Sequence, residues 1–205
     1  RVAEGQVDAF QLQLRNRSTD RDLELDIKTL RSFQRDKSVQ LSGAGTLNKR
    51  PFDTTLSLNN VASLLEVNQW EIDWQGFIGA ATFQSSAYIE AVDQWMQSRL
   101  SASLHTNSAN ELLTTLSLPL IDDGPVDIAI TLGPDLAATV LDIDATFGEF
   151  QIKGLASSET PDTLASGQVA MIASGPDLAQ LGAFFGEKNW PASAFQANVD
   201  TSLRN

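Results

Sequence analysis

Apolar and polar residues alternate with a period of two along most of this chain. The pattern is clearest in residues 126–132, where Val, Ile, Ile and Leu alternate with Asp, Ala and Thr. A period of two is that of a β-strand with one apolar and one solvated face. Similar runs occur at residues 7–14, 23–27, 39–47, 52–58, 70–76, 100–104, 141–147, 150–152, 169–173 and 195–203. The chain is therefore predicted to be mainly β, with a few short helices.

Four features predict where those helices lie. Residues 86–98 place Tyr88, Val92, Trp95 and Met96 at helical spacing, which predicts an amphipathic helix. The Gly-Pro-Asp-Leu units at 133–136 and 175–178 combine a turn with a capping carboxylate, so each is predicted to start a short helix. Asn59 or Asn60 could cap a helix through Leu65, and residues 109–116 predict another helical turn.

Internal similarity indicates repeated units. Residues 51–58 (PFDTTLSL) match residues 125–132 (PVDIAITL), each beginning with a proline. The pattern predicts units over roughly 37–100 and 100–186, stacked in one direction within a single domain spanning 1–205. The link at residues 48–51 is short enough to predict antiparallel neighbours.

Composition excludes several functions. The formal net charge is −12 and the pI is about 4.3, which argues against nucleic-acid binding because phosphate affinity needs clustered Lys and Arg. There is no cysteine, so disulfides and zinc–thiolate sites are excluded. No apolar run is long enough for a membrane-spanning helix. The sequence starts at Arg1 without a signal-like stretch, so we expect a mature product or part of a longer protein.

No grouping of residues predicts catalysis, a metal site or a cofactor. His105 is the only histidine, and no Gly-x-Ser-x-Gly elbow accompanies it, so a surface role is expected. Asp122, Asp123 and Asp127 lack the spacing of a hand-type calcium loop and predict an acidic turn. Gly43 and Gly45 predict a bend or bulge in a strand rather than a phosphate site.

Several structural motifs follow one another along the chain: Leu118-Pro119-Leu120, Gly124-Pro125-Val126, Leu141-Asp142-Ile143-Asp144, the segment 148–154 (GEFQIKG) and the segment 174–182 (SGPDLAQLG), with a weaker echo over 41–65. In this order they resemble the AsmA-like family of bacterial envelope proteins. The resemblance implies an elongated antiparallel sheet, curved into an open groove built from repeats. It also implies a periplasmic location, an inner-membrane anchor outside this chain, and a role in moving phospholipid towards the outer membrane or in outer-membrane assembly. About 200 residues is short for such a bridge, so the chain is expected to be a segment of one.

Two interpretations of the apolar strand faces remain open. In the first, a non-enzymatic groove binds phospholipid or other acyl chains, and its predicted lining is Leu56, Leu58, Ile128, Ile130, Leu132, Ile143, Phe150 and Ile152. In the second, helices close the sheet, and the domain is structural or binds an envelope protein partner. Trp70 and Trp74 share a strand face with Ile72, which predicts packing on the apolar side.

Overall fold

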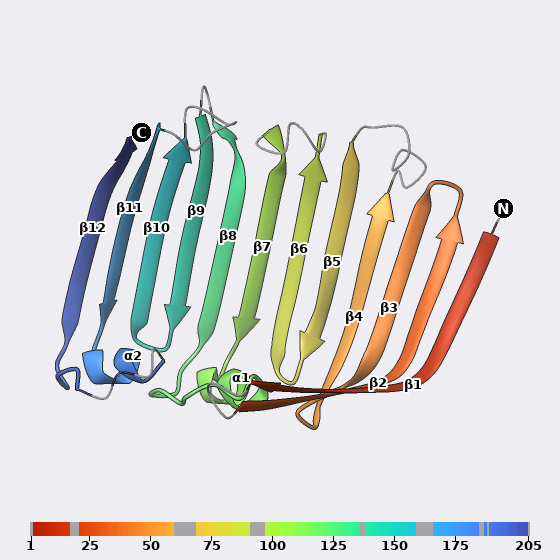
Figure 1. Ribbon diagram of the computed structural model, residues 1–205, viewed down its shortest axis with the longest axis horizontal. Coiled ribbons are helices and arrows are strands. Elements are labelled where there is room, and N and C mark those ends of the chain that lie inside the picture. Colours follow the sequence, from red (N-terminus) through yellow and green to blue (C-terminus); the bar gives the residue numbers. More distant parts are fainter. Residues whose placement is uncertain are drawn as a thin grey trace.

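The computed structural model describes residues 2–16, 21–59, 69–90, 97–135, 138–158, 166–184, 187 and 189–204. They form one antiparallel sheet of twelve strands in which each strand pairs with its neighbours in sequence (Figure 1). The strands are β1 Val2–Asn16, β2 Arg21–Arg35, β3 Ser38–Leu47, β4 Arg50–Asn59, β5 Trp70–Ile78, β6 Ala81–Ile89, β7 Arg99–Thr106, β8 Val126–Asp135, β9 Ala138–Phe147, β10 Phe150–Ser158, β11 Ser166–Gly175 and β12 Phe195–Arg204, and the helices are α1 Ala109–Thr115 and α2 Leu178–Phe184. The prediction of a mainly β, antiparallel fold is confirmed.

Tight turns explain why successive strands become neighbours. The turn between β3 and β4 consists of Asn48 and Lys49, both at positive φ (48° and 67°). Two such residues are what a type I′ hairpin turn requires, and its twist matches that of the strands. Gly79 and Gly148 also have positive φ, at the β5–β6 and β9–β10 turns.

Strand register places the apolar residues of the alternating runs on one side of the sheet. Directly paired residues share a face, so a row can be followed from strand to strand. One such row contains Leu41, Leu56, Trp74, Ser85, Ala102, Ile130, Ile143, Gly154, Met171 and Val199. We call this side the apolar face and the opposite side, which carries most of the Asp, Ser, Thr and Gln residues, the wet face.

The sheet is open and uncurled. Both α1 and α2 lie at the same end of the strands and leave most of the sheet without a second layer among the described residues (Figure 1). The accessible surface is 13474 Å² for a 22.2 kDa chain. A compact monomer of that mass would expose about 9,400 Å², so this molecule is thin and extended.

The buried core is small and lies where α1 meets the sheet. It consists of Ala81, Ala109, Leu112, Leu113, Ile121, Val126 and Phe150, with Leu104, Leu118, Phe147, Leu181 and Phe195 among the side chains packed against it. The predicted helical turn near residue 112 and the predicted helix start at Leu178 are both confirmed by α1 and α2.

The predicted helix over 86–98 is wrong in its first part. Residues 86–89 belong to β6, which pairs along its whole length with β5. Ser85 and Ala87 occupy positions on the apolar face where large apolar residues would have revealed the period of two. Residues 91–96 lie outside the described residues, as does the helix predicted between Asn60 and Leu65.

The helix predicted to start at Gly133-Pro134-Asp135-Leu136 is also wrong. Gly133, Pro134 and Asp135 continue β8 and pair with Val140, Thr139 and Ala138 of β9. Only two residues connect Asp135 to Ala138, fewer than one helical turn. Pro134 is tolerated because β8 pairs with β7 only as far as Leu132, so the proline lies where the strand has one neighbour.

The first hairpin departs from the plane of the others. Ala9 in β1 has a φ of 58°, and the register between β2 and β3 shifts between Ile27 and Thr29. Both strands bend at the helix end of the sheet and run on across it towards α1 (Figure 1). The bulge lies opposite Gly43–Gly45, as predicted for those glycines, and a Cβ at Gly45 would overlap the backbone carbonyl of Asp26.

Candidate functional site

All the residues predicted to line a groove lie on the apolar face. Leu56, Ile130 and Ile143 belong to the row described above, and the remaining members occupy the parallel rows on either side. Phe150 is 6% exposed because it packs in the core, whereas the others are half-buried. Trp70 and Trp74 lie on this face with Ile72, as predicted.

The apolar face contains a first hollow, which we call the β4 hollow. It has a volume of about 400 Å³ and is lined by Leu25, Ile27, Leu30, Leu41, Ser42, Gly43, Leu47, Phe52, Thr54, Leu56, Trp74, Ile78 and Phe83. Trp74 contributes a ring that is 47% exposed. Its indole Nε1 donates a 2.6 Å hydrogen bond to Thr54 Oγ1, so the polar atom of the ring has a partner and the rest presents carbon.

A second hollow, the α2 hollow, lies at the other side of the small core. Its volume is about 360 Å³, and it is lined by Ile121, Phe147, Phe150, Gln151, Ile152, Ala173, Ser174, Leu181 and Phe195. Leu181 comes from α2 and Ile121 from the segment between α1 and β8, so this hollow has walls from the helix end as well as from the sheet. Both volumes lie within the range of small-molecule sites.

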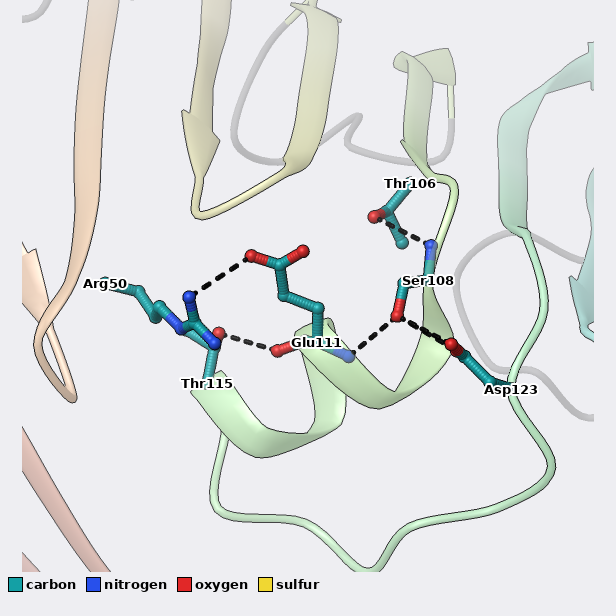
Figure 2. Close-up of polar contacts among 6 residues, drawn as sticks. All are labelled: Arg50, Thr106, Ser108, Glu111, Thr115 and Asp123. Atoms are coloured by element: carbon teal, nitrogen blue, oxygen red, sulfur yellow. Dashed lines mark hydrogen bonds and ion pairs between the residues drawn. The ribbon is translucent and has the colours of Figure 1, made fainter.

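A cluster of polar side chains holds the start of helix α1 in place (Figure 2). Ser108 Oγ accepts a hydrogen bond from the Glu111 backbone N–H (3.1 Å) and donates one to Asp123 Oδ1 (2.9 Å). Asp123 Oδ1 also accepts from the Asn110 N–H at 3.1 Å. Ser108 and Glu111 have the spacing of a capping box, but the Glu111 carboxylate pairs with Arg50 of β4 at 3.5 Å.

These contacts lower the pKa of Asp123. The largest cause is the hydrogen bond from the Asn110 backbone N–H, followed by the hydrogen bond from the Ser108 hydroxyl. Both stabilise the ionised carboxylate. Of the predicted acidic turn, Asp122 and Asp123 lie in the linker between α1 and β8 and hydrogen-bond to residues of α2 and of the start of α1. The prediction is wrong for Asp127, which belongs to β8.

The remaining ionisable candidates lie on the wet face. His105 Nδ1 and Asp127 Oδ1 are 2.6 Å apart between β7 and β8, with both side chains more than half exposed. Lys153 and Asp144 pair at 3.1 Å between β10 and β9. Among the described residues no group of three possible metal ligands occurs, and no helix there is both long and apolar enough to cross a bilayer.

Some of the residues that line the two hollows were not predicted from the sequence. Leu30 was hidden because the β2 bulge changes which residues of that strand face the same side. Phe83 was hidden in a run whose neighbours Ser85 and Ala87 are small. Ile121 and Leu181 lie outside any strand, so alternation gave no signal for them. The short apolar pair Leu120-Ile121 before Asp122-Asp123 was the available hint for Ile121.

Comparison of the chain with protein-family models, with curated proteins and with solved structures finds no match.

Proposed function

We propose that this chain is a non-enzymatic segment that binds lipid acyl chains on its apolar face. The observation that supports this most strongly is the continuity of that face. The row from Leu41 to Val199 is apolar in eight of its ten strands, Ser85 and Gly154 being the exceptions, and described helices cover only one end of the sheet. Val7, Phe10, Leu12, Leu30, Trp74, Met171 and Val199 all lie on this side and remain exposed. A large exposed apolar surface needs a partner of matching chemistry.

Hydrocarbon suits this surface better than a small polar substrate does. The two hollows present almost only carbon, and most charged side chains of the strands point to the wet face. Arg50, at the start of β4 on the apolar side, pairs with Glu111 of α1. Each methylene removed from water contributes about 0.8 kcal/mol. Ten buried methylenes would thus contribute about 8 kcal/mol, equivalent to a micromolar dissociation constant before ordering costs are subtracted.

The wider role that we propose follows the resemblance to the AsmA-like family. In that role the open sheet is one part of a groove in a longer periplasmic protein, anchored in the inner membrane outside this chain. The groove, built from repeated units, conducts phospholipid between the inner and outer membranes and so supports outer-membrane assembly. The similar segments 51–58 and 125–132 begin at the same level along their strands, because Phe52 and Val126 lie in one row of paired residues. This arrangement is compatible with a repeated structural unit.

The test is lipid retention by the purified protein. Organic extraction followed by mass spectrometry should recover phospholipid or fatty acid in stoichiometric amounts. Leu56→Glu should lose this lipid, because a carboxylate on the apolar face is costly to desolvate. Thr55→Glu is the matched control, since Thr55 is the preceding residue and points to the wet face. Ile130→Glu and Ala129→Glu form a second pair of the same design.

Two results would reject the proposal. One is a folded wild-type protein that carries no lipid and takes up none from mixed vesicles. The other is equal retention by Leu56→Glu and Thr55→Glu. Either result would favour the alternative function, a structural or protein-binding domain of the envelope, in which another polypeptide covers the apolar face.

A further inference from the structure

We propose that the α2 hollow receives the methyl end of an acyl chain, and that the lipid headgroup is held away from this end of the sheet. This inference rests on the proposed function and assigns an orientation to the bound lipid. It is carried by the shape of the hollow, by the charges around it and by the hydrogen bonds among the polar groups beside it.

The shape is that of a site for the end of a chain. Strands β9 to β12 supply one wall through Phe147, Phe150, Ile152 and Phe195, while Leu181 of α2 closes the side towards the strand ends. At about 360 Å³ the hollow is more than twice the size of a 150 Å³ cavity that takes up benzene. It can therefore hold several methylenes of a tail.

Among the described residues, most charges next to the lining of the hollow are acidic; Lys153 follows the lining residue Ile152 but points to the wet face, where it pairs with Asp144 at 3.1 Å. Asp122 follows the lining residue Ile121, Glu149 precedes Phe150, and Asp177 and Glu187 flank the α2 segment. No Lys or Arg lies in the described parts of the segments 117–124, 148–152 and 173–190. An anionic phosphate or carboxylate headgroup would be repelled here and would lack the cationic donors that bind such groups.

The polar groups between α2 and the linker before β8 are already hydrogen-bonded to one another. Gln180 Oε1 accepts from the Asp122 N–H at 3.0 Å, and Gln180 Nε2 donates to Asp122 Oδ2 at 2.8 Å. Asp177 Oδ1 accepts from the Ala179 N–H at 2.9 Å. These bonds fix α2 to the linker before β8 and occupy its polar groups. Apart from Gln151 and Ser174, the side chains that line the hollow are apolar, which favours hydrocarbon.

Two photoreactive fatty acids test the orientation. One carries a diazirine next to its methyl terminus and the other carries it next to its carboxylate. After illumination, intact-mass measurement gives the amount bound, and peptide mapping gives the sites. The methyl-end probe should label the peptides that contain Phe150, Leu181 and Phe195. The carboxylate-end probe should label other parts of the apolar face.

A matched pair of variants links the labelling to the hollow. Ala173→Trp fills it and should lose methyl-end labelling there. Ala170→Trp places the same ring on the wet face of the same strand and should leave labelling unchanged. Equal or stronger labelling of the hollow by the carboxylate-end probe would overturn the orientation while leaving lipid binding intact. Absence of both probes from the intact mass would overturn the proposed function and the orientation together.

Discussion

Trp74 and Phe83 meet edge to face across β5 and β6, with ring centroids 4.9 Å apart and ring planes inclined at 65°. This arrangement places two of the three aromatic side chains of the β4 hollow in contact, while Thr54 of the neighbouring strand accepts the indole hydrogen bond. Trp74 is nevertheless 47% exposed, because no described element covers its outer surface. The fluorescence of the Trp74 indole should therefore respond to a ligand that enters the β4 hollow.

Tryptophan emission should shift to shorter wavelength when a long-chain fatty acid binds, because the Trp74 ring moves from water into hydrocarbon. Titration followed by fluorescence measures the effect. Trp74→Phe keeps an apolar ring in the hollow and should bind the fatty acid but lose most of the shift. A shift of unchanged size in Trp74→Phe would mean that the β4 hollow is not occupied.

The apolar face could be predicted from sequence because it depends on a local pattern. Register between short hairpins preserves the alternation, so Leu56 in β4 and Ile130 in β8 reach the same row without long-range information. Hollows depend instead on contacts between distant segments. Leu181 and Ile121 reach the α2 hollow only because Gln180 binds Asp122, 58 residues away in sequence. Similarly, Leu25 and Ile27 reach the β4 hollow because the first hairpin bends at its bulge.

Asn48 should be essential for the placement of that bent hairpin. Its Oδ1 accepts from the Glu24 N–H at 2.8 Å, and its Nδ2 donates to the Thr115 carbonyl at 2.8 Å. One side chain thus connects β2, the β3–β4 turn and α1. Asn48→Gly keeps the positive φ but removes these bonds, and we expect a loss of about 2 kcal/mol in the free energy of unfolding.

Lys49→Gly is the control for that prediction. Lys49 has a φ of 67° in the same turn, and its side chain is exposed. Glycine relieves the cost of positive φ, so this variant should be at least as stable as the wild type. Urea unfolding monitors both variants. Equal stability of Asn48→Gly and Lys49→Gly would show that the side-chain bonds of Asn48 contribute nothing.

The polar cluster at the start of α1 should weaken in acid. Since the pKa of Asp123 is lower in the folded protein than in the unfolded chain, the unfolded chain binds more protons as the pH falls below about 4. The stabilisation by Asp123 is thus complete above that pH and is lost as the pH falls through the folded pKa. Amide hydrogen exchange of α1, measured from pH 6 down to pH 3, should reveal this local loss.

Two variants identify the groups responsible for that pH dependence. Asp123→Asn should flatten it, because the amide does not titrate. Ser108→Ala removes the N-cap and should destabilise α1 by about 1 kcal/mol at neutral pH. If α1 in Asp123→Asn kept the wild-type acid sensitivity, another group would have to be its source.

Gly45 should tolerate no side chain, because the bulge of β2 brings the Asp26 carbonyl against its Cα. Gly45→Ala would force the two strands apart where the first hairpin bends, and we expect a loss of about 2 kcal/mol or more in the free energy of unfolding.

Gly154→Ala is the matched control. Gly154 lies in β10 on the same face, and an added Cβ there would have its nearest neighbour at 3.8 Å, an ordinary contact. This variant should be neutral or more stable by about 0.5 kcal/mol. Urea unfolding measures the stability of the two variants. The Trp74 fluorescence titration measures a second effect: Gly45→Ala should bind fatty acid more weakly, because Leu25 and Ile27 depend on the bend to reach the β4 hollow. Gly45→Ala with wild-type stability would contradict the close approach of β2 and β3.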